Sequence, residues 1–153
     1  MCIRDSFSIE EETEMDHISL SRWADLILIA PATANTISKL ANGNSDDLAS
    51  TVALASNKKI FIAPAMNVRM WEHESTKQNI TKLKSYNYRL IGPEIGDMAC
   101  GEYGEGKMSE PKKIINELDQ FKGTIINITH NPEKFINADK SFHIVDRQLV
   151  ENN

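Results

Sequence analysis

The chain is poor in cysteine, in long apolar runs and in clustered basic residues. It has two cysteines, Cys2 and Cys100, far apart in the sequence. This disfavours a disulfide framework and favours a reduced thiol at Cys100. No apolar run approaches the roughly 18 residues of a membrane span. Residues 1–14 lack the apolar core of a secretory signal, so we expect a cytoplasmic protein.

The charge pattern excludes further classes of function. The net charge is −5 and the charges are scattered, without the basic stripe of a nucleic-acid-binding protein. No second cysteine or paired histidine accompanies Cys100, so we predict no metal site. With 153 residues, 41% of them hydrophobic and 25% charged, the chain is long enough for one globular domain.

Apolar runs alternate with segments of helical periodicity. This alternation predicts an α/β fold with a doubly wound parallel sheet. The expected strands are Leu26–Ala30, Ile60–Ala63 and Arg89–Ile91, and the expected helices are Thr33–Ala41, Ser75–Tyr86 and Glu110–Phe121, with one more helix capped by Ser45 or Asp46. Residues 94–108 are expected to form a long loop with four glycines, and Thr124–Thr129 and Phe142–Val145 to form further strands.

Three turns follow the carboxyl ends of the expected strands, after Ala30, Ala63 and Ile91. Ligands of doubly wound sheets bind outside these ends. We therefore expect the three turns to meet at one edge and to form a site there.

The first turn, Pro31–Thr36, leads from a strand into a helix. Its backbone amides, with the Thr and Asn side chains, are suited to a phosphate or to the polar edge of a flavin. Simple capping by Thr33 is the alternative. The turn lacks the glycines of a dinucleotide fingerprint or a Walker loop.

The other two turns carry an amide and a thiol. Asn67 follows Pro64-Ala65-Met66 and is suited to a substrate carboxylate, or to capping a helix. Cys100 lies between Ala99 and Gly101 in the glycine-rich segment, where an exposed, reactive thiol is more typical than a buried one. His17, beside Ile18 and Leu20, is by its spacing alone more typical of a structural histidine.

Four segments together resemble the flavin-dependent cysteine decarboxylases, in particular phosphopantothenoylcysteine decarboxylase. They occur in the order and spacing of that family over residues 7–121. The segments are His17-Ile18-Ser19-Leu20 with Trp23-Ala24-Asp25, Ala30 to Thr36, Ala63 to Asn67 with Met70-Trp71, and Ala99-Cys100-Gly101 with Gly104 and Gly106-Lys107-Met108.

The resemblance implies a flavodoxin-like (Rossmann-like) fold that binds FMN and assembles as a homotrimer or an assembly of trimers. It implies decarboxylation of 4′-phosphopantothenoylcysteine to 4′-phosphopantetheine in coenzyme A biosynthesis, with His17 as the base and Cys100 as the proton donor. The FMN contacts would be Thr33, Ala34, Asn35, Thr36 and Ala65. Asn67 would hold the substrate carboxylate, and Asp97, Met98 and Ala99 would belong to a loop that clamps the substrate.

Other activities remain as alternatives. A peptidyl-cysteine decarboxylase of the same family would use the same motifs. Non-catalytic regulatory relatives have lost catalytic residues, whereas His17 and Cys100 are both present here. An inactive fragment is the third alternative.

The sequence departs from the family pattern at both ends. The family's first strands, with the loop that helps to hold the FMN phosphate, have no counterpart here. We therefore expect 7–121 to be a partial decarboxylase domain, and the polypeptide on its own to bind FMN poorly or to aggregate. Residues 122–153 would be a divergent tail, the start of a linker or a misread frame. They lack the glycine-rich sequence of the synthetase domain that follows in bifunctional relatives.

Overall fold

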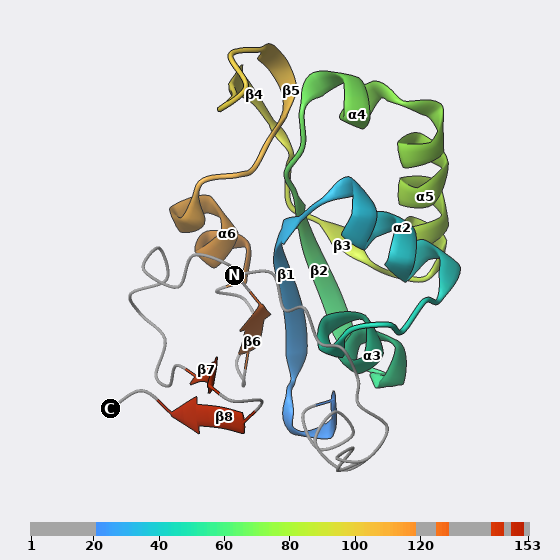
Figure 1. Ribbon diagram of the computed structural model, residues 1–153, viewed down its shortest axis with the longest axis vertical. Coiled ribbons are helices and arrows are strands. Elements are labelled where there is room, and N and C mark those ends of the chain that lie inside the picture. The colour runs from blue at the N-terminus through green and yellow to red at the C-terminus, as the bar shows by residue number, and fades with distance from the viewer. Residues whose placement is uncertain (1–20, 119–124, 129–141, 146–147, 152–153) are drawn as a thin grey trace.

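The computed structural model describes residues 21–118, 125–128, 142–145 and 148–151. In this part of the chain, a parallel sheet of four strands runs through the centre (Figure 1). Its order is β3-β2-β1-β6. The strands are β1 (Leu26–Ala32), β2 (Lys59–Pro64), β3 (Arg89–Leu90) and β6 (Ile125–Ile128). The three predicted strands are thus confirmed, with ends that differ by one or two residues.

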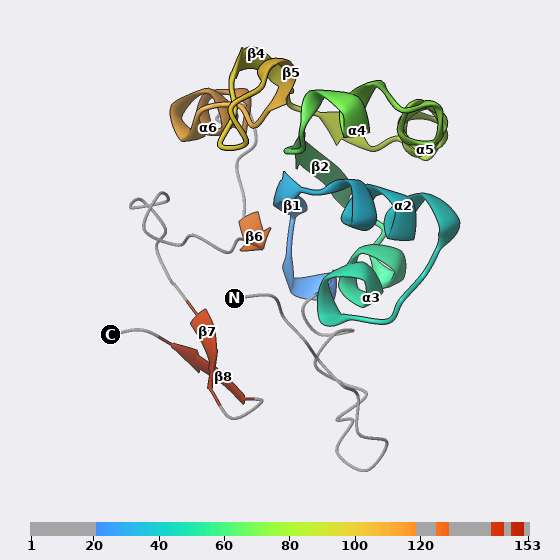
Figure 2. The same cartoon turned by 45° about the horizontal axis from the view of Figure 1, so that its top comes forward.

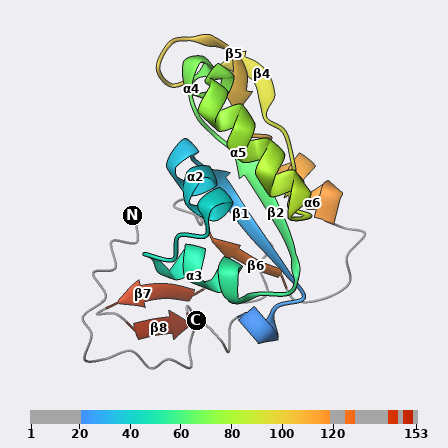
Figure 3. The same ribbon diagram turned by 90° about the vertical axis from the view of Figure 1, so that its right-hand side faces the viewer.

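Helices cover both faces of the sheet. On one face lie α2 (Ala34–Asn42), α3 (Leu48–Ala55) and α5 (Glu74–Ser85), and α2 packs beside α5 (Figure 3). On the opposite face lies α6 (Pro111–Leu118), to the left of β1 in Figure 1. The predicted α/β fold with a doubly wound sheet is therefore correct.

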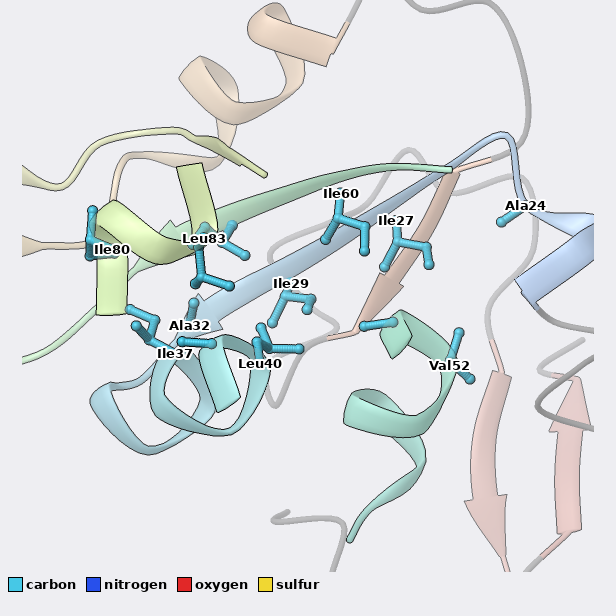
Figure 4. Packing of buried hydrophobic residues seen from close by; sticks show 13 residues of the cluster. Ala24, Ile27, Ile29, Ala32, Ile37, Leu40, Val52, Ile60, Ile80 and Leu83 are labelled. Carbon is cyan, nitrogen blue, oxygen red and sulfur yellow. The ribbon is translucent and has the colours of Figure 1, made fainter. Parts of the chain in front are cut away.

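Alternating side chains of β1 and β2 build two separate cores. Ile27, Ile29 and Ile60 point toward α2, α3 and α5 (Figure 4). Together with Ile62 they belong to a buried cluster that includes Leu40 and Leu83. On the other face, Leu26, Leu28, Phe61 and Ala63 pack against Ile114 and Leu118 of α6. Burial on both faces explains why these strands are continuous apolar runs.

Local capping explains the ends of α2. The Thr33 Oγ1 atom accepts a hydrogen bond from the Thr36 backbone N–H (3.2 Å), and Gly43 ends the helix in a left-handed conformation, with φ 69°. A glycine adopts this conformation without the steric cost of a Cβ atom. The predicted helix Thr33–Ala41 is thus confirmed, with Thr33 as its cap.

The predicted cap of α3 is wrong. Asp47 caps the helix, rather than Ser45 or Asp46, because Asp47 stands three residues before Ser50. Its Oδ1 atom accepts from the Ser50 N–H (2.8 Å), and the Ser50 hydroxyl accepts in return from the Asp47 N–H (3.3 Å). This reciprocal pair is a capping box. Asp46 instead forms an ion pair with Lys39 (2.7 Å).

The expected long loop 94–108 is largely a β-hairpin. Strand β4 (Glu94–Asp97) pairs antiparallel with β5 (Tyr103–Lys107), above the sheet in Figure 2. The expectation failed because glycine and acidic residues are depleted in strands, so the segment carries no strand signal. The backbone nevertheless pairs, with Gly104 and Gly106 at φ 155° and 140°.

The chain beyond α6 also contributes strands. As predicted, Ile125–Ile128 form a strand, which pairs parallel with β1 from Leu26 to Ile29. Strand β7 (Phe142–Val145), also predicted, pairs antiparallel with β8 (Gln148–Glu151). The domain boundary at 121 stays a prediction, although β6 extends the main sheet past it.

The connections run from β1 through β2 to β3 and then return to β6 on the other side of β1. Such a reversal marks where ligands bind in doubly wound folds. The switch lies at the carboxyl end of β1.

Among the described helices, none has the length and apolar character needed to cross a membrane.

Candidate functional site

Backbone hydrogen bonds join the turns at the carboxyl edge of the sheet. The Ala65 N–H donates to the Ala32 carbonyl (3.0 Å), which links the turn after β2 to the turn after β1. The next residue, Met66, donates its N–H to the Gly106 carbonyl (3.0 Å). These bonds hold the hairpin β4–β5 against the turn after β2, so the expected convergence of the turns is present.

A pocket of about 480 Å³ opens between the turn after β2, the tip of the hairpin and the segment that enters α6. Three chain segments form its wall: Ala65–Asn67, Asp97–Cys100 and Gly106–Pro111. Every substrate-binding residue predicted from the sequence is in this wall, together with Ala65 and Cys100.

Asn67 is half-buried and caps the short helix α4 (Val68–Glu72). Its Oδ1 atom accepts a hydrogen bond from the Met70 backbone N–H (2.8 Å). This bond uses the acceptor of the amide and leaves the Nδ2 group, a donor, for another partner. The two alternatives for Asn67 are therefore compatible: capping fixes the side chain, and its donor remains available at the pocket.

Cys100 is exposed near the tip of the hairpin, in a turn closed by two backbone bonds. The Gly101 N–H donates to the Met98 carbonyl (2.9 Å), and the Met98 N–H donates to the Glu102 carbonyl (2.9 Å). The Cys100 thiol donates to the Glu102 carboxylate, with 3.8 Å between Sγ and Oε2. An exposed thiol in a pocket wall is accessible to a ligand, as a reactive cysteine requires.

The turn after β1 is adjacent to the pocket but is not part of its wall. Thr33 uses its hydroxyl both as the cap of α2 and in a bond to the Thr36 hydroxyl (3.0 Å). Ala34 and Asn35 follow in the first turn of the helix, where backbone N–H groups have no partner within the helix. The five predicted cofactor contacts thus lie on two neighbouring turns, joined through the Ala65–Ala32 bond.

His17 lies outside the described residues, so its predicted role as a base stays a prediction. Within the part that the structure describes, no group of three or more His, Cys, Asp or Glu side chains is arranged to hold a metal ion.

The sequence reasoning missed the contribution of Gly106, Lys107 and Ser109 to the pocket wall. A Cβ atom on Gly106 would collide with the Met66 carbonyl oxygen, so only glycine permits this close approach. Ser109 is fully buried. For Gly106 and Lys107 the available signal was their place in the fourth segment of the family resemblance, to which no site role was assigned; for Ser109 it was the position shortly before Pro111, at the start of an expected helix.

Comparisons with known proteins identify the family of the chain. The Flavoprotein family model matches residues 2–123. The chain is 44% identical over 132 residues to the coenzyme A biosynthesis bifunctional protein CoaBC of Haemophilus influenzae, an alignment that covers 82% of this chain and 33% of that protein. The chain thus spans about a third of that relative's length.

Two solved structures share the fold. A PPC decarboxylase mutant complexed with pantothenoylaminoethenethiol is 40% identical, with a TM-score of 0.67, over 69% of this chain and 59% of that one. The FMN-binding protein AtHal3 is 41% identical, with a TM-score of 0.63, over 69% and 58%. With a family model that spans most of its residues, and with these structural relatives, the chain belongs to the Flavoprotein family and has its flavodoxin-like fold.

Proposed function

We propose that this chain catalyses the FMN-dependent decarboxylation of 4′-phosphopantothenoylcysteine to 4′-phosphopantetheine, a step of coenzyme A biosynthesis. The observation that carries the proposal is the presence of an amide donor, Asn67, and an exposed thiol, Cys100, in the wall of one pocket. The relationship to a CoaBC protein and to a PPC decarboxylase supports the same substrate class.

The residues at the strand ends fit a flavin. The free N–H groups in the first turn of α2 and the exposed Asn35 side chain suit its polar edge or its phosphate. Met66, Met98 and Met108 line the pocket beside them, and thioethers pack well against aromatic rings. AtHal3, a relative of this chain, is an FMN-binding protein, which also supports FMN.

The substrate itself explains why a redox cofactor is required. Its carboxylate lies on a carbon next to an amide nitrogen, where no group accepts the electron pair that carbon dioxide leaves behind. When bound, FMN would supply the missing electron sink by taking a hydride as the cysteinyl thiol is oxidised to a thioaldehyde, and by returning it at the end.

The chain's own residues would then orient the carboxylate and deliver the proton. The Asn67 Nδ2 group would donate a hydrogen bond to the carboxylate and hold it until it leaves. After carbon dioxide departs, Cys100 would give its thiol proton to the carbon of the ene-thiolate, as a general acid. The predicted base, His17, would remove the substrate's thiol proton at the start.

Replacement of the thiol tests the proposed function. With FMN in excess, we expect the wild-type chain to release carbon dioxide and form 4′-phosphopantetheine, detected by mass spectrometry. Cys100→Ser should slow this by at least about 100-fold, the usual contribution of a general acid. The matched control is Cys2→Ser, the same chemical change at the other cysteine, which should keep the wild-type rate.

Parallel assays determine the substrate class. A peptide with a C-terminal cysteine is the alternative substrate, and turnover of the peptide alone would replace our assignment with a peptidyl-cysteine decarboxylase. If neither compound loses carbon dioxide, or if Cys100→Ser retains the parental rate, the mechanism above is wrong.

We also propose that the working form is a homo-oligomer built from trimers and that it acts in the cytoplasm on this small-molecule substrate. A synthetase domain would follow in a full-length CoaBC-like protein. Light scattering after size-exclusion chromatography measures the oligomer directly, and a monomer that retains full activity would contradict the first of these proposals.

A further inference from the structure

Ser109 carries a buried hydroxyl without a hydrogen-bond partner. The residue has no exposed surface, and within the described part of the chain its Oγ atom is the one buried side-chain oxygen or nitrogen without a partner. Buried polar groups in folded proteins are nearly always paired, because an unpaired group has lost its hydrogen bonds to water. A partner from outside the chain would restore this balance.

Packing places the hydroxyl but gives it no hydrogen-bond partner. The Ser109 Oγ atom lies against Gly92, and a Cβ atom added to Gly92 would overlap it. The Ser109 side chain therefore occupies space that Gly92 leaves open. An alanine at position 109 would keep the Cβ atom and remove the unpaired oxygen, leaving beside Gly92 a space of about one oxygen atom.

Ser109 also belongs to the pocket wall, between Lys107 and Pro111. A serine side chain has three staggered positions about its Cα–Cβ bond. A rotation between these positions would move the hydroxyl away from Gly92, so its present place does not fix the direction of its hydrogen bond. Lys107, in the same wall, has a side chain that is 42% exposed, and its nearest ion-pair partner is Glu110, at 3.9 Å.

The strand order indicates which ligand Ser109 meets. Gly92 directly follows Ile91, at the end of β3, whereas Thr33 follows β1, and β2 lies between these strands. Ser109 is thus on the β3 side, away from the turn after β1, which carries four of the five residues assigned to FMN; the fifth, Ala65, lies in the same pocket wall as Ser109. Asn67 and Cys100, assigned to the reacting end of the substrate, lie in the wall of the same pocket.

We propose that Ser109 is a substrate-binding residue: its hydroxyl donates a hydrogen bond to an oxygen of the substrate chain beyond the cysteinyl group, an amide carbonyl or an acidic oxygen. This inference rests on the proposed function and extends it to a residue that determines substrate affinity. The bond forms in both the ground state and the transition state, because it is remote from the reacting carbon. Its loss therefore raises KM and leaves kcat unchanged.

The test is Ser109→Ala, with three readouts. KM for 4′-phosphopantothenoylcysteine should rise about fivefold, as for a lost neutral hydrogen bond, with kcat unchanged. FMN affinity, measured by flavin fluorescence, should not change. The melting temperature of the unliganded protein should stay the same or rise, because the substitution removes an unpaired buried oxygen.

Ser50→Ala is the matched control. Ser50 is also buried, but its hydroxyl donates to Asp47 Oδ1 (2.9 Å). This variant should lower the melting temperature and leave KM unchanged. Ser109→Cys, which keeps a weak donor of similar size, should restore part of the affinity.

Each contrary result has a definite meaning. An unchanged KM in Ser109→Ala overturns the inference, and so does a lowered melting temperature, which would make the hydroxyl structural. Weakened FMN binding with normal substrate affinity would reassign Ser109 to the cofactor. Calorimetry with 4′-phosphopantetheine separates the two proposals. If the wild-type protein binds this compound but does not catalyse decarboxylation, the proposed reaction alone is contradicted. If Ser109→Ala binds the compound as tightly as the wild type, the role of Ser109 is contradicted. No binding by the wild type overturns both.

Discussion

The turn after β1 and the hairpin β4–β5 both border the candidate site, but different interactions hold them in place. The turn is fixed locally, because Thr33 bonds to Thr36 three residues away and Ile37 of the same helix is fully buried. The hairpin is fixed at a distance, because Gly106 bonds to Met66, forty residues earlier in the chain. The side of the site that we propose to hold the cofactor is therefore encoded mainly locally, and the side that we propose to hold the substrate depends on close approaches between distant segments.

The hairpin is also more exposed to solvent than the turn after β1. The turn after β1 begins from a buried strand, whereas Cys100, Tyr103 and Ile95 of the hairpin are exposed. The hairpin packs through glycines that permit close contact with α4. A Cβ atom on Gly104 would lie 2.8 Å from Val68 Cγ2. We therefore expect backbone changes in the hairpin to affect the site more than changes of similar size at the turn.

The largest expected effect is that of Gly106→Ala. The new Cβ atom would meet the Met66 carbonyl oxygen and would break the Met66–Gly106 bond, at a backbone φ of 140° that disfavours alanine. We expect the free energy of unfolding in urea to fall by about 3 kcal/mol. In a Cys2→Ser background, alkylation of Cys100 should become faster, because the hairpin is no longer held in place.

Gly101→Ala is the matched control for that change. Gly101 also has a positive φ, 80°, but no atom lies within 4 Å of its Cβ position. Only backbone strain remains, which costs about 1 kcal/mol. Equal losses in the two glycine variants would show that strain, and not contact with Met66, explains the effect, and our account of the hairpin would then be wrong.

The contrast between local and distant interactions also decided what the sequence was able to predict. Thr33 and Gly43 define α2 through rules that act within a few residues, and apolar runs predicted β1 and β2. The hairpin was expected to be a loop, because no residue between 94 and 108 signals that its backbone pairs. Ser109 was missed for a related reason: its distinguishing property is the lack of a partner, which only the packed structure reveals.

An intermediate effect is expected at Asn67, which combines a local helix cap with a hydrogen-bond donor at the pocket. Aspartate caps helices as well as asparagine does, and its charge suits a helix start. Asn67→Asp should therefore keep the bond to Met70 and the stability, but it replaces a donor with a carboxylate that repels the substrate's own. We expect KM to rise by at least about tenfold, roughly 1.4 kcal/mol, in steady-state assays.

Asn67→Ala completes this test, because it removes the cap and the donor together. It should lower both stability, by about 1 kcal/mol, and substrate affinity. If Asn67→Asp keeps both the stability and the KM of the parent protein while Asn67→Ala lowers stability, Asn67 acts as a helix cap only.

The smallest effect is expected at the locally encoded turn. Thr33→Ala removes the hydroxyl that accepts from the Thr36 N–H, so the free energy of unfolding should fall by about 1 kcal/mol, as for other lost helix caps. Thr33→Ser keeps that acceptor and should lose no more than a few tenths of a kcal/mol. In both variants the alkylation rate of Cys100, again without Cys2, should match that of the parent protein, because the cap acts within the first turn of α2. A faster rate in Thr33→Ala would mean that the two sides of the site are coupled through the Ala32–Ala65 bond, and the division between a locally fixed and a distantly fixed side would not hold.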